Sequence, residues 1–155
     1  MNRKDLLILS HLRENSRATL THISKKTHMP ISTIYDKLKQ YENSVIVKHT
    51  TLLNFEKLNF NTKAKVLLKA SREQRDALGK YLSTAPNVNS LHKVNNGYDY
   101  MIEAVFRHIK DLEDFIELLD SKFQLVNKDV YFIIEDIKRE GFLNNPELID
   151  LHMSS

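Results

Sequence analysis

Residues 16–41 limit what this chain can fold into more than any other stretch, because they carry the pattern of two short helices around a tight turn. The first helix has Leu20 and Ile23 on one side, with Thr19 or Thr21 as its N-cap. Apolar residues of the second helix recur at steps of three and four, at Ile31, Ile34, Leu38 and Tyr41. This pattern predicts a helix-turn-helix, whose second helix lies in the major groove of DNA.

The side of the second helix opposite its apolar stripe is polar. Four small polar or acidic residues are candidates for contacts with base edges: Ser32, Thr33, Asp36 and Gln40. Three basic residues are candidates for phosphate contacts: Arg17, Lys37 and Lys39. The candidate DNA-binding set is completed by Thr19, Tyr35, Lys48 and His49. Two other interpretations stay open: Asp36 orients Lys37 or Lys39, or the whole polar arc is only the solvated side of a packed helix.

Two further elements flank these helices. Residues 2–14 predict a first helix whose inner stripe consists of Leu6, Leu7, Leu9 and Leu12. Residues 45–53 are β-branched or apolar around the charged pair Lys48-His49, which predicts a small hairpin. Such a hairpin is the wing of a winged helix. We therefore expect a winged helix-turn-helix domain over residues 1–50.

The charge distribution supports a polyanionic partner for this region. The chain of 155 residues has a net charge of +3. Residues 1–50 carry nine Lys or Arg against four Asp or Glu, a balance of +5, whereas the remainder has a balance of −2. Double-stranded DNA would therefore meet the N-terminal third. A mildly basic helical domain also arises by chance, so charge alone does not decide the partner.

The second half of the chain predicts a different fold. Its pattern indicates strands over 62–70, 88–94, 98–106 and 130–137, and helices over 72–82 and 110–123. The order β-α-β-β-α-β is that of a ferredoxin-like domain. We expect an α+β protein with a hinge over 51–60, the ferredoxin-like domain over 61–140 and a C-terminal tail over 141–155. Within this tail, residues 146–151 predict one last helical turn.

Several kinds of chemistry find no support in the sequence. The chain has no cysteine, and its seven histidines lack a metal-ligand spacing, so we expect no metal, cofactor or catalytic residue. The acidic residues Glu113, Asp114, Glu117 and Asp120 fit a solvated helix face better than a cation site. No apolar run is long enough to span a membrane, and a reducing cytoplasm fits the composition.

The chain resembles the Lrp/AsnC family of feast/famine transcriptional regulators over almost its whole length. The opening DLLILSHLRENSRATLTHIS is similar to the first two helices of that family, and PISTIYDKLKQYE to its recognition helix. VIVKHTTLLNFEKLNF resembles the wing and hinge, while GYDYMIEAVF and IIEDIK resemble the central turn and last strand of its effector domain. The resemblance implies a sequence-specific transcriptional regulator that is not an enzyme.

The resemblance also implies partners. Members form homodimers by pairing their C-terminal sheets, and often tetramers or octamers. Many sense an amino acid or a related metabolite at an interface between C-terminal domains, at a loop that corresponds here to Asn95, Asn96, Gly97, Tyr98 and Asp99. In this chain Asn96 stands at the family's glycine position and Gly97 at its acidic position. An amino-acid effector, another effector and an empty pocket therefore stay open, as does a turn-capping role for Asp99.

A second departure lies in the DNA-binding turn, where His28 replaces a glycine of the family. We expect His28 to take a positive φ with modest strain. Two alternatives to a specific regulator follow from the architecture. One is an architectural protein that coats DNA with little sequence preference. The other is a sirohaem decarboxylase, which the absence of tryptophan and the segment AKVLLKASREQRDAL disfavour.

Overall fold

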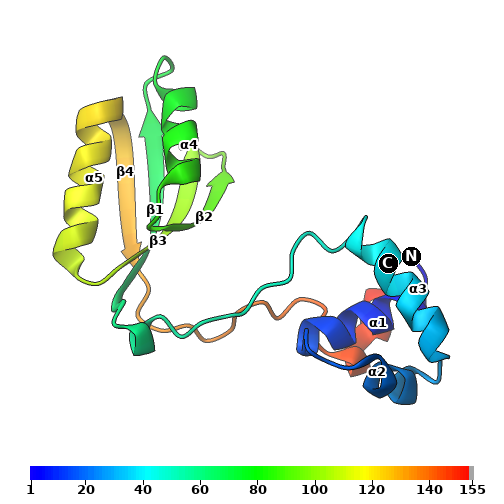
Figure 1. The fold of residues 1–155 in the computed structure, drawn as a ribbon. Helices are drawn as coiled ribbons and strands as arrows, with labels where there is room; N and C mark the ends of the chain where they lie inside the picture. The colour runs from blue at the N-terminus through cyan, green and yellow to red at the C-terminus, as the bar shows by residue number, and fades with distance from the viewer. Residues whose placement is uncertain (154–155) are drawn as a thin grey trace. The chain divides into compact units, whose positions relative to one another are not determined.

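The computed structural model describes residues 1–153, and the chain divides into two compact units (Figure 1). The first unit consists of residues 1–52 together with the chain from Ile137 onward, and the second unit is Leu53–Asp136. The first contains helices α1 (Arg3–Glu14), α2 (Leu20–Thr27) and α3 (Ile31–Glu42) and the 3-10 helix η2 (Pro146–His152). No helix within residues 1–153 is long and apolar enough to cross a membrane.

The core of the first unit lies between its three α-helices. Five side chains form it: Ile8, Ile23, Met29, Ile34 and Tyr41. The inner stripe predicted for α1 is confirmed for Leu9 and Leu12, which pack against this core, but not for Leu6 and Leu7. The fully packed positions of the helix also include Ile8, Ser10 and His11, which are buried. The reason lies far along the chain, since η2 covers a second side of α1 (Figure 1).

The C-terminal segment is held to α1 by specific contacts. Ile149 of η2 is fully buried. The guanidinium of Arg3 donates to both carboxylate oxygens of Asp150, at 2.5 and 3.1 Å. Arg13 donates to the carbonyl oxygen of Phe142 at 2.7 Å and to that of Glu140 at 3.0 Å. The segment 140–150 therefore takes part in the packing of the first helix.

The turn between α2 and α3 has the predicted backbone conformation. His28 follows the last residue of α2 with φ 55° and ψ 33°, so the expected positive φ is confirmed. The hydroxyl of Ser24 donates to the carbonyl oxygen of Met29 at 2.6 Å and closes the turn. Thr19 is the N-cap of α2, because its hydroxyl accepts from the backbone N–H of His22 at 3.1 Å. The helix-turn-helix predicted from the sequence is therefore present.

The wing hairpin predicted over residues 45–53 is not formed. The carbonyl oxygen of Tyr41 accepts the backbone N–H groups of Ser44, Val45 and Ile46, and residues 46–54 are neither helix nor strand. Val47 is 98% exposed. Two-residue hairpin turns favour pairs such as Asn-Gly, and this segment has Lys48-His49 between its apolar residues instead.

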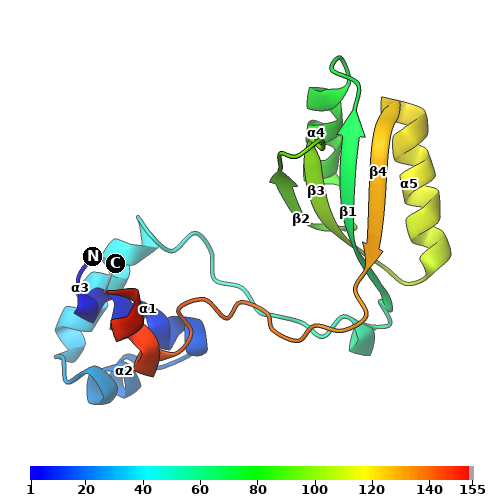
Figure 2. The ribbon, with the colours of Figure 1, turned by 180° about the vertical axis from the view of Figure 1, so that it is seen from behind.

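The second unit is a four-stranded antiparallel sheet covered on one face by two helices (Figure 2). Its strands are β1 (Thr62–Ala70), β2 (Val88–Lys93), β3 (Tyr100–Phe106) and β4 (Leu125–Phe132), in the order β2-β3-β1-β4. The helices are α4 (Arg75–Thr84) and α5 (Ile109–Phe123), and a short 3-10 helix η1 (Glu56–Leu58) precedes β1. The predicted β-α-β-β-α-β order and α+β class are confirmed.

Burial alternates along β1, so successive side chains lie on opposite faces of the sheet. Ala64, Val66 and Leu68 are fully buried beneath the helices, and the residues between them are partly exposed. The prediction for the last strand, 130–137, is wrong in its bounds. β4 begins directly after α5, where Gln124 takes φ 50°, and the isoleucines Ile133, Ile134 and Ile137 that favoured the prediction lie beyond it.

Candidate DNA-binding surface and effector loop

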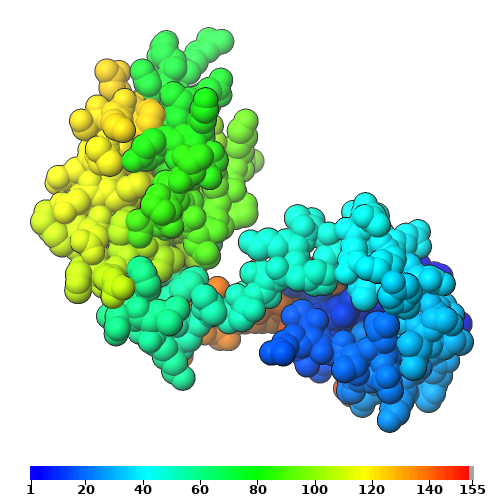
Figure 3. Space-filling view, viewed as in Figure 1, coloured from blue at the N-terminus to red at the C-terminus, as the bar shows by residue number. Residues whose placement is uncertain are grey.

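The outer face of α3 carries the four candidates for base contacts. Ser32, Thr33, Asp36 and Gln40 are all exposed, and their side chains have no hydrogen-bond or ion-pair partner within residues 1–153. In the space-filling view of Figure 3, α3 (light blue to cyan) lies on the surface of the first unit. This face is therefore free to meet another molecule.

The flanks of this face differ from the prediction at one position. Ile34 and Tyr41 are buried as expected, but Ile31 is 46% exposed at the first turn, so its predicted place in the inner stripe is wrong. Ile31 is the first residue of α3, directly after the N-cap Pro30, so it lies at the end of the helix and not along its packed length. Tyr35 is 50% exposed, and the ammonium of Lys39 lies 5.7 Å from the centre of its ring. Ile31 and Tyr35 therefore add apolar contact area beside the polar candidates.

Lys37 points into the first unit rather than outward. Its ammonium lies 2.5 Å from Asp5 Oδ1 on α1, and the Tyr41 hydroxyl donates to the same oxygen at 2.5 Å. The other oxygen of Asp5 accepts the backbone N–H of Asn2 at 2.9 Å. Burial raises the pKa of Asp5, but these hydrogen bonds outweigh it and lower the pKa to about 2. Burial and the hydrogen bond to Asp5 raise the pKa of Tyr41.

This Asp5 cluster, formed by Asp5, Lys37 and Tyr41, fastens α3 to α1. Sequence reasoning placed Lys37 among phosphate contacts because helical spacing put it on the flank of the polar face. It did not single out Asp5, since an acidic residue in the first turn of a helix is ordinary. Only the packing of the two helices shows that the two residues meet.

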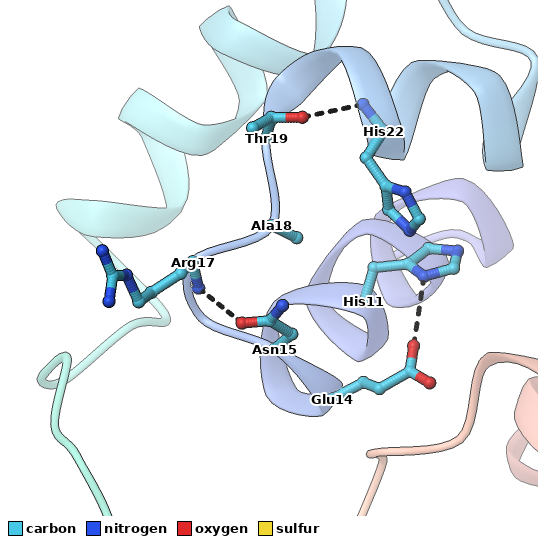
Figure 4. A pocket seen from close by; sticks show the side chains of 7 residues that line it. All are labelled: His11, Glu14, Asn15, Arg17, Ala18, Thr19 and His22. Atoms are coloured by element: carbon cyan, nitrogen blue, oxygen red, sulfur yellow. Dashed lines mark hydrogen bonds and ion pairs between the residues drawn. The ribbon is translucent and has the colours of Figure 1, made fainter.

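The corner between α1 and α2 forms a cavity of about 450 Å³ (Figure 4). It is lined by His11, Glu14, Asn15, Arg17, Ala18, Thr19 and His22. The backbone N–H of Arg17 donates to Asn15 Oδ1 at 3.0 Å, while its exposed guanidinium has no partner in the described part of the chain. Arg17 and Thr19, two of the candidate DNA contacts, both line this cavity, and His11 and His22 are neighbours that the sequence did not single out.

The remaining two candidates lie in the segment after α3. His49 Nε2 is 3.8 Å from Glu42 Oε1, and the exposed Lys48 makes no hydrogen bond or ion pair within residues 1–153. Because the wing is absent, neither residue is held by a hairpin. Among the described residues, no cluster of three or more His, Asp or Glu side chains is arranged to hold a metal ion.

The candidate effector loop connects β2 to β3. Asn96 has φ 64° and Gly97 φ 90°, so Asn96 takes the left-handed conformation that a glycine would favour at its position. The Tyr98 hydroxyl donates to a carboxylate oxygen of Asp129 on β4 and accepts from the Asn127 amide at 3.2 Å. The hydrogen bond to Asp129 raises the pKa of Tyr98. The loop is therefore tied across the sheet to β4.

Asp99 is bound to its own unit. One oxygen lies 2.8 Å from Arg75 Nε, at the first residue of α4, and the other accepts the backbone N–H of Ala70 at 3.0 Å. Its side chain is only 9% exposed. Sequence analysis missed Arg75, because it lies 24 residues before Asp99 and only the sheet topology brings the two together.

Two family models match this chain. The Lrp/AsnC ligand binding domain matches residues 63–143, over half of the chain, and a winged helix-turn-helix DNA-binding model matches residues 1–44. The chain belongs to the Lrp/AsnC family. It is a DNA-binding transcriptional regulator of that type, which supports this interpretation over the architectural and decarboxylase alternatives. The winged-helix match ends before the segment in which no wing is formed.

Relatives of this Lrp/AsnC regulator carry matching names. An uncharacterized HTH-type transcriptional regulator of Pyrococcus furiosus is 28% identical over 137 residues, covering 88% of this chain and 93% of the relative. The glutamate uptake regulatory protein of Zymomonas mobilis is 23% identical over 150 residues, covering 94% of this chain and 92% of the relative. These relatives are transcriptional regulators by name, not enzymes.

Solved structures share the fold. A transcriptional regulator from Neisseria meningitidis, solved as an L-Met complex, superposes with a TM-score of 0.82 at 22% identity, covering 90% of this chain and 93% of the other. LrpC of B. subtilis superposes with a TM-score of 0.80 at 19% identity, covering 89% of this chain and 97% of LrpC. The helix-turn-helix and the βαββαβ unit thus follow the architecture of known Lrp/AsnC regulators.

Proposed function

We propose that this regulator recognises its DNA sites through the outer face of α3. The observation that carries the proposal is the row of four exposed and unbonded polar side chains, Ser32, Thr33, Asp36 and Gln40. Gln forms paired hydrogen bonds with adenine, and a carboxylate accepts from cytosine, so the row is able to discriminate between bases. Side chains that were only solvated would give no such discrimination.

Phosphate contacts come from the basic residues around this row. Arg17, Lys39 and Lys48 are exposed, and Thr19 stands at the start of α2. We assign Lys37 a smaller share than the sequence suggested, because its ammonium is already paired with Asp5. His49, beside Glu42, remains a candidate contact in the segment after α3.

We further propose that the protein acts as a homodimer, built through the sheet of its second unit. The face of the sheet opposite the helices includes Leu67, Met101 and Tyr131, and Tyr131 is 56% exposed. Two α3 helices of a dimer would address two half-sites of a pseudo-palindromic operator. Sedimentation equilibrium measures the assembly, including any tetramer or octamer, and a monomer at every concentration would refute this part.

As a DNA-binding regulator, the protein works in the cytoplasm.

The effector proposal rests on the loop Asn95–Asp99. The N. meningitidis neighbour was solved with L-Met and the Z. mobilis relative is named for glutamate uptake, so we propose an amino acid or a related metabolite. Asp99 is held by Arg75 and Ala70, and Gly97 carries no carboxylate. An effector therefore either displaces the Arg75 pair or uses it. Calorimetric titration with single amino acids tests this part, and heat from none of them would refute it.

Competition binding separates specific recognition from mere DNA coating. A duplex recovered by selection from a random pool is labelled and then displaced by bulk DNA at one fixed salt concentration. A specific regulator prefers its site by about a thousandfold or more. Nearly equal affinities that fall together as salt rises would refute the proposal.

A further inference from the structure

The first turn of α3 carries an apolar side chain that the first unit does not use in its core. Ile31 is 46% exposed, whereas Ile34, one turn further along the helix, is fully buried. Within residues 1–153, Ile31 is neither one of the five core side chains of the first unit nor one of the partly buried side chains packed against them. The apolar surface of Ile31 is therefore available for contact with another molecule.

The neighbours of Ile31 place it at the edge of the face proposed to contact bases. Residues three and four positions apart are neighbours on a helix surface, so Tyr35 lies beside both Ile31 and Ser32. Tyr35 is 50% exposed, and the ammonium of Lys39 lies 5.7 Å from the centre of its ring. An apolar strip that begins at Ile31 and continues over Tyr35 therefore borders the polar row.

The chemistry of Ile31 selects one feature of the major groove. Each base presents hydrogen-bonding atoms there, but thymine also presents its C5-methyl group. Isoleucine has no side-chain donor or acceptor, so it recognises the methyl group and not the hydrogen-bonding atoms. Residues at the N-terminal end of a recognition helix are those that contact base edges. The balance of +5 over residues 1–50 favours DNA as the molecule that meets this end.

We propose that Ile31 contacts the C5-methyl group of a thymine in each half-site and thereby selects thymine at that position. The inference rests on the proposed recognition of DNA by the outer face of α3, and it adds a residue and a base to that function. Tyr35 extends the apolar contact. The polar side chains of Ser32, Asp36 and Gln40 discriminate by hydrogen bonds, so they do not account for a preference that depends on a methyl group.

The first experiment removes this methyl group and leaves the pairing of the base unchanged. A duplex that the wild type selects from a random pool is resynthesised with deoxyuridine in place of each thymine in turn, and competition binding at one fixed salt concentration gives the affinities. Burial of one methyl-sized group corresponds to about fourfold in affinity. We expect uracil at one position of a half-site to weaken binding by about this factor, and uracil at the other positions to change it little.

Substitutions assign the effect to Ile31. Ile31→Ala is expected to bind the thymine and uracil duplexes equally well, whereas Ile31→Val keeps part of the discrimination. Leu148→Ala is the matched control, because Leu148 is an apolar residue of the first unit that is 48% exposed, and it should keep the full effect. An unchanged melting temperature of Ile31→Ala shows that its first unit is folded, as the absence of Ile31 from the core leads us to expect.

A second arm separates contact with the methyl group from an effect of sequence on DNA shape. The sensitive thymine is replaced by cytosine or by 5-methylcytosine, which restores the methyl group on a different base. We expect the added methyl to regain about fourfold in affinity for the wild type and nothing for Ile31→Ala. An equal gain for both proteins would show that the methyl group acts through the DNA and would overturn the assignment to Ile31.

Two further results would contradict the inference, and they differ in what else they refute. If the selected duplex bound the wild type equally well with uracil at every position, or if Ile31→Ala kept the full thymine preference, Ile31 would not select thymine. Both results leave recognition by the polar row of α3 intact. A selection that yielded no preferred duplex would instead refute the proposed function, and the inference with it.

Discussion

Replacing Asp5 by asparagine is expected to weaken the whole first unit and to remove the part of its acid sensitivity that comes from Asp5. The pKa of Asp5 is lowered from 3.8 to about 2, and its side chain is 12% exposed. A depressed carboxylate pKa contributes stability above the unfolded value that is lost as pH falls through the folded value. The shift corresponds to about 2 kcal/mol at neutral pH, lost between about pH 4 and pH 2.

The substitution keeps the shape of the side chain but removes its charge. Lys37 and Tyr41 then donate to a neutral amide, so we expect a loss of about 2 to 3 kcal/mol at pH 7. Asp36→Asn is the matched control, because that carboxylate is exposed on the same helix as Lys37 and has no partner within residues 1–153.

The assay must report on one unit at a time. Denaturant unfolding followed by NMR of isoleucine methyl groups does so, because Ile8 and Ile34 are buried in the first unit, and Ile102 and Ile116 in the second. We expect Asp5→Asn to shift only the first pair. An unchanged midpoint for Ile8 and Ile34 at pH 7, or a wild type whose first unit lost no stability in acid, would refute the reasoning.

Other substitutions test the packing. Ile149→Ala should destabilise the first unit by about 2 to 5 kcal/mol, since the residue is fully buried, whereas Leu151→Ala, at 72% exposed, should change little in the same assay. Gly79→Ala on α4 should lower the melting temperature of the second unit despite the better helix propensity of alanine, because the added Cβ would lie 2.7 Å from Tyr100 Cζ. A rise in melting temperature would contradict that packing. Asp99→Asn should loosen the start of α4, seen as faster amide exchange at Leu78, whose N–H donates to the Gln74 carbonyl, and unchanged exchange would show that the ion pair does not hold α4.

Local patterns were enough to predict the helix-turn-helix. The spacing of Ile34, Leu38 and Tyr41 determines where α3 lies and which of its faces is free. Residue type limited the N-cap of α2 to Thr19 or Thr21, and Thr19 is the one observed. The positive φ of His28 could also be predicted, because the family pattern placed a glycine there. Each of these features depends on neighbours within a few residues.

Features made by distant residues could not be predicted. Asp5 meets Lys37 across 32 positions, and η2 returns to α1 from the far end of the chain. The wing, in contrast, was predicted but is not formed. The β-branched residues at 45–47 favour a strand only where a partner strand pairs with them, so the local pattern alone was not enough. The effector loop lies between these cases: the conformation of Asn96 is local, whereas the Arg75–Asp99 pair depends on the sheet.

The central claim is that the outer face of α3 determines which DNA is bound. Selection of bound sequences from a random pool, run in parallel for the wild type, Gln40→Ala and Arg17→Ala, tests it most directly. The account predicts that Gln40→Ala loses base preference at one position of each half-site, while Arg17→Ala binds every sequence more weakly with its preference unchanged. An identical base preference for Gln40→Ala and the wild type, found again for Ser32→Ala, would contradict the claim.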